Sequence, residues 1–484
     1  MKAMLRIGRA AQAGRRSLAG ERPARGGRLL LGLVTACWLA GLAAGAAKAE
    51  VGFFTPRGAP QALAGKVQFV KINVSSPDQL ESSLRMAQAG GLRLRLDMGP
   101  VVTTPMPSGR VGRHYVTRDD GRRHDKLLPP DADNKLRQFP DDVRLRAILA
   151  PYLERVAAYP AVVDRVFLAD EPYLNGISRQ EMERAGRVTR EELDRRGLRH
   201  VRLGVVFAAG MFNAEFARMV DDASVRYVRQ LDDHYRAPNE DQAGHEAWKR
   251  QIQRVRLATY DRAGNMYLGG GFPAGFDLVA FDFYLSTILL DGVHEHTLDW
   301  LAKHYPKAGC ASFAEQSMTQ VRQTLTFFRD GPVTQQPDAQ TSDRRMLNQI
   351  FDCRMNAVTE MLLKERGNRP IEVMLIAESG NNGVLEFDAR QQVEPDQPPL
   401  LVEARVLDEV RRAECFYVRH QRSYRGLMFF TFENEYDNTI RLHVGGAAGM
   451  PTVLSSIFNF AGAWQDGKSL SKLPSHCTIA PQRR

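Results

Sequence analysis

Two glutamates, Glu171 and Glu378, each stand at the end of a short apolar run. The runs are FLADEP at residues 167–172 and LIAESG at residues 375–380, and both continue into turn-forming residues. Two carboxyl groups at one end of a sheet suit the cleavage of a glycosidic bond. In that reaction one acid protonates the leaving oxygen, while a second carboxylate attacks or stabilises an oxocarbenium-like centre. The alternative interpretation is that each glutamate is a solvated or ion-paired residue at a strand end.

The elements that must position these glutamates form a repeating pattern. From residue 66 onward, short apolar strands alternate with capped amphipathic helices, which is typical of parallel β/α units. The expected strands lie at residues 51–55, 66–74, 92–98, 163–169, 201–208, 276–284, 371–377 and 426–432. Eight such strands predict an α/β fold, a (β/α)₈ TIM barrel that occupies residues 50–484.

Long connections interrupt this pattern at residues 99–141, 209–275 and 285–370, and each follows the C-terminal end of an expected strand. In a TIM barrel, the active site lies on the face where the strands end. We therefore expect long insertions on this face, and we expect both glutamates at the mouth that they surround.

The strand expected at residues 92–98 alternates strictly between apolar and charged side chains. If the leucines face the helices, Arg95 and Asp97 point into the barrel. Side chains expected to contact a substrate are Asn73, Arg95, Asp97, Asp170, Tyr173, Asp282, Tyr284 and Glu433, with Lys71, Phe432 and Asn434 as further candidates. Each of these side chains, taken alone, also fits a structural role.

With these motifs the chain resembles the retaining TIM-barrel glycoside hydrolases, a superfamily whose acid/base follows strand four and whose nucleophile follows strand seven. If residues 51–55 are the first strand, Glu171 ends strand four and Glu378 ends strand seven. The resemblance implies that Glu171 is the acid/base and Glu378 the nucleophile. It also implies that Tyr284, in the motif DFY at residues 282–284, hydrogen-bonds the nucleophile. The motifs DEP, ESG and DFY are short and identify no specific family.

Asp170 departs from this superfamily, which often has asparagine before the acid/base to bind the sugar 2-hydroxyl group. A carboxylate at this position can accept the same hydrogen bond. It would also repel a second negative charge and raise the proton affinity of Glu171, which suits a general acid. An unaltered pH profile in Asp170→Asn would contradict this expectation.

Residues 1–49 predict a secretory signal peptide. An arginine-rich stretch at residues 2–28 precedes an apolar run, and AKA at residues 47–49 forms the A-x-A pattern of a cleavage site before Glu50. The alternatives are a lipoprotein signal at Cys37, a twin-arginine signal at residues 15–16 and a retained membrane anchor. We expect an exported protein, periplasmic or secreted, with no stable membrane span after cleavage.

The formal net charge of the chain, +10, resides mostly in this signal. Removal of residues 1–49 takes away nine basic residues and one acidic residue, which leaves 57 basic and 55 acidic residues. A net charge of +2 predicts no nucleic acid as a partner.

Four cysteines remain after the signal: Cys310, Cys353, Cys415 and Cys477. An even number in an oxidising compartment allows two disulfides, whose pairing the sequence leaves open. No Cys/His spacing of a structural zinc site occurs, and the sequence therefore gives no reason to expect a metal or another cofactor.

The first interpretation is thus an exported glycoside hydrolase whose partner is a polysaccharide or oligosaccharide. The second is a non-catalytic barrel that binds or guides a polysaccharide and needs no pair of carboxylates in register. A third is a barrel hydrolase that uses Asp97, Asp282 and a bound metal. The glycan, the stereochemical course and the oligomeric state do not follow from the sequence.

Overall fold

A computed structural model describes residues 50–105, 116–117, 123–124, 137–173, 175–219, 270–283, 294–310, 337–380, 399–437, 442–465 and 477. Residues from Ala49 to the C-terminus belong to one compact unit. Two predicted features, the signal peptide and Tyr284, lie outside the described residues.

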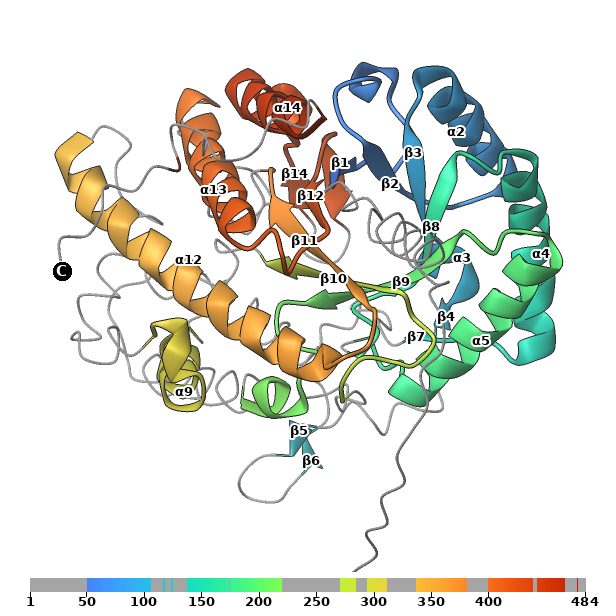
Figure 1. The fold of residues 1–484 in the computed structure, drawn as a ribbon, viewed down its shortest axis with the longest axis horizontal. Helices are drawn as coiled ribbons and strands as arrows, with labels where there is room; N and C mark the ends of the chain where they lie inside the picture. Colours follow the sequence, from blue (N-terminus) through green and yellow to red (C-terminus); the bar gives the residue numbers. More distant parts are fainter. Residues whose placement is uncertain are drawn as a thin grey trace, which may run out of the picture. The chain divides into compact units, whose positions relative to one another are not determined.

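A closed barrel of eight parallel strands forms the centre of the fold (Figure 1). In order around the barrel, the strands are β1 (Glu50–Phe54), β2 (Phe69–Asn73), β3 (Arg93–Asp97), β8 (Val163–Asp170), β9 (Arg202–Ala208), β10 (Leu278–Phe283), β11 (Glu372–Glu378) and β12 (Gly426–Phe430). Strand β12 pairs with β1 and closes the barrel. The TIM-barrel prediction is confirmed, and each expected strand begins and ends within three residues of the observed one.

Helices alternate with these strands and cover the outside of the barrel (Figure 1). The α-helices are α2 (Pro77–Gly90), α3 (Gly99–Val102), α4 (Asp142–Ala158), α5 (Arg179–Arg195), α9 (His294–His304), α12 (Pro337–Arg366), α13 (Pro399–Arg419) and α14 (Pro451–Gln465). Helix α4 packs between α2 and α5, and α13 packs against α14. Short 3-10 helices lie at η1 (Gln61–Leu63), η4 (Pro306–Ala308) and η5 (Ala447–Gly449).

Small two-stranded sheets lie in the connections after the barrel strands. They pair β4 (Thr104–Pro105) with β7 (Arg137–Gln138), β5 (Val116–Thr117) with β6 (Arg123–His124), and β13 (Glu435–Asp437) with β14 (Leu442–Val444). The pairs β4/β7 and β5/β6 both belong to the long connection after β3, which is one of the insertions expected on the face of the strand ends.

Residues at the ends of α2 and α5 show why these helices begin and end where they do. Ser76 caps α2 by accepting a hydrogen bond from the backbone of Gln79, and Gly91 ends this helix in the left-handed conformation, with φ 63°. Ser178 and Glu181 form a capping box at the start of α5. Such side chains satisfy backbone groups that the first and last helical turns leave without partners. Because its ends are fixed in this way, each helix determines where the next strand enters the barrel.

The interior of the barrel is filled by its own apolar cluster, separate from the core between strands and helices. Its buried members are Phe54, Phe69, Phe167, Val206, Leu278, Ala280, Met374, Ile376 and Met428. Two glycines make room for the largest rings. A Cβ atom at Gly204 would lie 2.7 Å from the ring of Phe167, and one at Gly52 would overlap Phe69. Large and small residues on facing strands thus fit together, and the barrel is a packed core rather than a pore.

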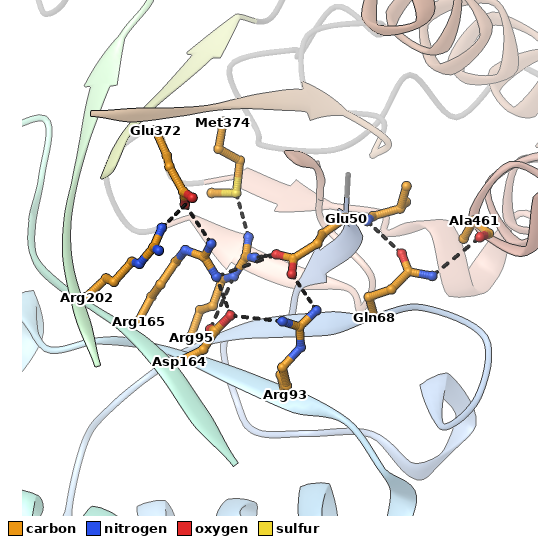
Figure 2. Close-up of polar contacts among 11 residues, drawn as sticks. Glu50, Gln68, Arg93, Arg95, Asp164, Arg165, Arg202, Glu372, Met374 and Ala461 are labelled. Atoms are coloured by element: carbon orange, nitrogen blue, oxygen red, sulfur yellow. Dashed lines mark hydrogen bonds and ion pairs between the residues drawn. The ribbon is translucent and has the colours of Figure 1, made fainter. Parts of the chain in front are cut away.

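The N-terminal end of the barrel is filled by charged side chains (Figure 2). Glu50 pairs with Arg93 and with Arg95, and Glu372 pairs with Arg165 at 2.8 Å and with Arg202. Asp164 pairs with Arg165 and lies 3.5 Å from both Arg93 and Arg95. This set of seven residues, called the N-terminal network below, connects strands β1, β3, β8, β9 and β11.

Two disulfides link Cys310 to Cys353 and Cys415 to Cys477. The first joins Cys310, two residues after η4, to α12, and the second joins α13 to Cys477 near the C-terminus. The expected number of disulfides is confirmed, and the structure supplies the pairing.

Candidate active site

Glu171 and Glu378 lie at the C-terminal ends of two barrel strands. Counted from β1, strand β8 is the fourth and ends at Asp170, directly before Glu171, while β11 is the seventh and ends at Glu378. The expected first strand is present, and the two glutamates lie three strands apart, as predicted, with β9 and β10 between them. Both residues therefore lie at the face where a TIM barrel carries its active site.

The end of β8 departs from regular strand geometry in a way that the sequence pattern does not indicate. Between Phe167 and Asp170 the register against β9 shifts, so that Asp170 pairs with Val206. Such a bulge changes the direction of the side chains that follow it. It brings Asp170 onto the inner face, where it interacts with Lys71 and Asp97.

Glu171 adopts a left-handed backbone conformation, with φ 44°. This conformation costs a residue with a Cβ atom about 1 kcal/mol or more. Its neighbours hold it there: the Glu171 amide donates to the carbonyl of Val206 at 3.0 Å, and its carbonyl accepts from the Asn175 amide at 3.1 Å. A strained acidic residue at a strand end suggests that the position of its side chain is functionally important.

Below the mouth, Lys71 and Asp97 form a buried ion pair, and each is 3% exposed. The second carboxylate oxygen of Asp97 accepts a hydrogen bond from the Gly99 amide at 3.0 Å. The Lys71 Nζ atom also lies over the rings of Phe54 and Phe167, at 4.9 and 5.5 Å from their centroids. Both charges are therefore fixed in position, as buried charges require.

These surroundings change the proton affinity of the groups at the mouth. Burial would lower the pKa of Lys71, but Asp97, Asp170 and Asp282 outweigh this effect and raise it, so Lys71 stays a cation. Although solvent reaches Asp170, the protein around it removes part of its hydration and raises its pKa to about 6. Asp97 adds to this rise in the pKa of Asp170, and Lys71 opposes it.

Among these groups, Asp282 on the inner face of β10 has the most strongly raised pKa. Burial raises its pKa well above the ordinary value for aspartate, and the negative charges of Glu171 and Asp170 raise it further. Both charges act on Asp282 from the neighbouring end of β8. Asp170, Glu171 and Asp282 therefore influence one another's ionisation at this end of the barrel.

Glu378 is 3% exposed, and its register partner across the strand pair is Phe430 on β12. The ring of Phe430 stacks on that of Phe54, with 5.2 Å between the centroids. The amide of Ser379 donates to the Phe430 carbonyl at 2.6 Å, which fixes the chain directly after Glu378. An aromatic pair thus lies next to this carboxylate. Phe54 and Phe430 both belong to apolar strands, so the sequence alone gives no signal that their rings lie beside Glu378.

Two predicted contact residues lie elsewhere. Arg95 points into the barrel, but its guanidinium group turns to the N-terminal end, stacks 3.3 Å from the centre of the Phe69 ring and pairs with Glu50. Tyr173 is 1% exposed and donates a hydrogen bond to the Gly271 carbonyl at 2.7 Å, while its ring packs against Phe207. The prediction that these two side chains face a substrate is therefore wrong.

The remaining predicted residues lie at or near the mouth. Asn73 ends β2 and is the register partner of Asp97. Glu433 is half-buried in the loop after β12. Tyr284 follows directly after the last residue of β10, but it lies outside the described residues, so its contact with Glu378 remains a prediction.

The metal-dependent alternative gains no support from this arrangement. Asp97 is engaged by Lys71 and Gly99. Among the residues that the structure describes, no group of three or more His, Cys, Asp or Glu side chains is suited to hold a metal ion.

No protein-family model and no curated protein matches the chain. Solved structures similar to it include the GH53 catalytic domain of Ignisphaera aggregans, at 9% identity over 88% of this chain and 93% of the other, with a TM-score of 0.35. An endo-β-1,4-glucanase from Xanthomonas axonopodis pv. citri has 11% identity over 85% and 98% of the two chains, with a TM-score of 0.34. A β-glucosidase from Thermotoga maritima has 10% identity over 82% and 84%, with a TM-score of 0.31. Likeness at this level supports no inference about activity, and the barrel is established by its own strand pairing.

Proposed function

We propose that the chain is a glycoside hydrolase that cleaves a polysaccharide or oligosaccharide, with Glu171 as acid/base and Glu378 as nucleophile. The observation that carries the proposal is the location of these glutamates at the C-terminal ends of barrel strands four and seven. Glycosidic cleavage requires two carboxyl groups in different protonation states on the two sides of the scissile bond.

The environments of the two glutamates support different roles. Glu171 is partly exposed and lies close to other carboxylates, and such neighbours favour a bound proton, as a general acid requires. Glu378 is deeply buried beside the aromatic pair of Phe54 and Phe430. Aromatic rings next to a carboxylate suit the apolar face of a sugar ring. Asp170 is our candidate for binding the sugar 2-hydroxyl group, with Asn73 at the end of β2 and its register partner Asp97 buried below the mouth.

The test compares Glu171→Ala and Glu378→Ala with the parent on a panel of polysaccharides, with product size as the readout. We expect both variants to lose at least about 100-fold in kcat/KM. Glu372→Gln is the matched control, because this glutamate belongs to the same strand as Glu378 but lies at the opposite end of the barrel. It should lower stability while the folded fraction keeps its activity. Equal activity in all four proteins would end the assignment. Binding without turnover in the parent would instead favour a non-catalytic barrel.

We also propose that hydrolysis retains the anomeric configuration through a covalent intermediate on Glu378. Once a substrate is known, proton NMR of the first product identifies its anomer, and mass spectrometry of the quenched enzyme detects a glycosyl adduct. Inversion would contradict the nucleophilic role of Glu378, while leaving the two-carboxylate mechanism intact.

Export of the mature protein is a further part of the proposal. The two disulfides are compatible with an oxidising compartment. No helix in the described part of the chain has the length and apolar character needed to cross a membrane. N-terminal sequencing of the exported protein should find Glu50 as the first residue. Recovery of the uncleaved chain in the membrane fraction would favour a retained anchor.

A further inference from the structure

The carboxylates at the ends of β8 and β10 face each other across β9. Asp170 pairs with Val206 of β9, and Asp282 pairs with Ala208 of the same strand. Strands β8 and β10 are therefore separated by two strand spacings, or about 10 Å between backbones. Inward side chains converge towards the barrel axis, so carboxylates on these two strands can approach each other closely.

No polar side chain of β9 lies between Asp170 and Asp282. The side chains of β9 at this level, Val206 and Ala208, are small and apolar. Glu171 lies on the same side because its backbone amide is hydrogen-bonded to Val206. Three carboxyl groups thus lie around the end of β9, and negative charges gathered in this way raise one another's proton affinity.

Among the residues that the structure describes, the other groups around Asp282 do not supply a cation of its own. The backbone amide of Ala209, directly after β9, donates to the Asp282 carboxylate and to its carbonyl. On β11 its register partner is the apolar Ile376, and the next inward residue is Glu378. Lys71 acts on Asp282 from across the barrel, but Asp97 holds it as an ion-pair partner.

We propose that Asp282 is a neutral carboxylic acid at neutral pH and a positioning residue for Glu171. Its O–H group donates a hydrogen bond towards the Asp170 carboxylate while Glu171 holds its proton, and towards the Glu171 carboxylate once that proton has been given up. The direction of the pKa shift of Asp282, caused by burial and by those two charges, agrees with this assignment.

The consequence for catalysis rests on the proposed function. When Glu171 gives its proton to the leaving oxygen, the resulting carboxylate accepts the hydrogen bond of Asp282, which keeps its own proton. A donor aimed at charge that develops in the transition state stabilises it more than the ground state. Water later returns a proton to Glu171, through general-base catalysis, and the proton count is restored.

The first test needs no substrate. The net charges of the parent and of Asp282→Asn are compared by electrophoretic mobility from pH 5 to pH 9. If Asp282 is neutral, the two proteins have the same mobility at neutral pH, and they separate by one charge only at higher pH. Asp299→Asn, an exposed aspartate on α9, is the control and should differ from the parent by one charge at neutral pH. A one-charge difference between the parent and Asp282→Asn at neutral pH would overturn the proposal.

The second test uses activity and compares Asp282→Asn with Asp282→Ala, after thermal melts have shown that both variants fold. Asparagine is neutral and keeps an N–H donor, so Asp282→Asn should retain most of kcat. In the parent we expect kcat/KM to decrease at high pH as Glu171 loses its proton and again as Asp282 loses its own, and Asp282→Asn should lack the second decrease. Asp282→Ala lacks the donor and should lose about 100-fold in kcat. Equal kcat and equal pH profiles in all three proteins would reject the role of Asp282, while Glu171→Ala and Glu378→Ala still decide the proposed function separately.

Discussion

Asp170 illustrates how a single residue can adjust both the stability and the chemistry of the barrel mouth. It lies next to the proposed acid/base, and Lys71 and Asp97 act on it from below. A carboxylate at this position gains hydrogen-bonding capacity towards a sugar hydroxyl but introduces a charge where others are already present. Because a neutral asparagine would bind the same hydroxyl without this charge, the carboxylate costs stability at neutral pH.

This cost makes stability depend on pH. The pKa of Asp170 is about 6 in the folded protein, above the ordinary value of about 3.9 for an unfolded chain. Between these two values the folded state binds more protons than the unfolded state, so stability falls as pH rises from about 4 to about 6. We expect Asp170→Asn to be more stable than the parent at pH 7.5, by about 1 kcal/mol after allowance for solvent screening, and to match it near pH 4. Urea unfolding at both pH values measures this, and parallel pH profiles for the two proteins would contradict it.

The backbone of Glu171 allows a second prediction at this scale. At φ 44° glycine fits better than alanine, so Glu171→Gly should unfold with a free energy about 1 kcal/mol higher than Glu171→Ala, although neither is active. Glu378 supplies the control, because it lies within a regular strand. At this position the order of stability should reverse, with Glu378→Ala more stable than Glu378→Gly, since glycine destabilises a strand. The same order at both positions would mean that Glu171 is not strained in solution.

At the scale of elements, the sequence predicts most of what the structure contains. Apolar runs bounded by turn residues locate all eight strands, and Ser178 with Glu181 locates the start of α5. The bulge in β8 could not be predicted in the same way, because strict alternation would place Ala169 inward instead of Asp170. Alternation also identifies Arg95 as inward-facing, but it does not tell towards which end of the barrel a long side chain turns.

The fit of large and small residues between strands gives a prediction for β8 and β9. Gly204→Ala would bring a methyl group within 2.7 Å of the Phe167 ring, whose strand carries Asp170 at its end. We expect a loss of about 1 to 3 kcal/mol in the free energy of unfolding. Gly426→Ala is the control, because its methyl group would meet the flexible Met374 side chain at 3.3 Å and should cost less. Phe167→Leu should partly rescue Gly204→Ala, and an absence of rescue would show that the clash is not with this ring.

At the scale of the whole molecule, the two ends of the barrel interior use charge for different purposes. The mouth gathers carboxylates around Lys71, and this arrangement shifts proton affinities. The N-terminal network instead pairs nearly every charge with an opposite one (Figure 2). Between them lies the apolar cluster of the interior, which keeps the two groups of charges apart. Because of this division, we expect substitutions among the charged residues at the mouth to leave the ion pairs of the N-terminal network unchanged.

The division predicts that stability and activity can be separated at Glu50. This residue is the first of β1 and pairs with Arg93 and Arg95 of β3, so it links β1 to the strand beyond its neighbour β2. Glu50→Gln removes the negative charge and leaves Arg95, which is 1% exposed, without its main partner. Removal of one member of a buried ion pair costs about 3 to 5 kcal/mol, because the other charge stays buried.

We therefore expect a marked decrease in the unfolding temperature of Glu50→Gln, measured by circular dichroism, with kcat unchanged at temperatures where the variant is folded. The control Glu81→Gln replaces the half-buried partner of the exposed Arg85 in a surface ion pair on α2 and should change neither quantity by much. A decrease in kcat of folded Glu50→Gln as large as that of Glu171→Ala would contradict this prediction. It would show that the charges at the two ends of the barrel interact in spite of the apolar cluster between them.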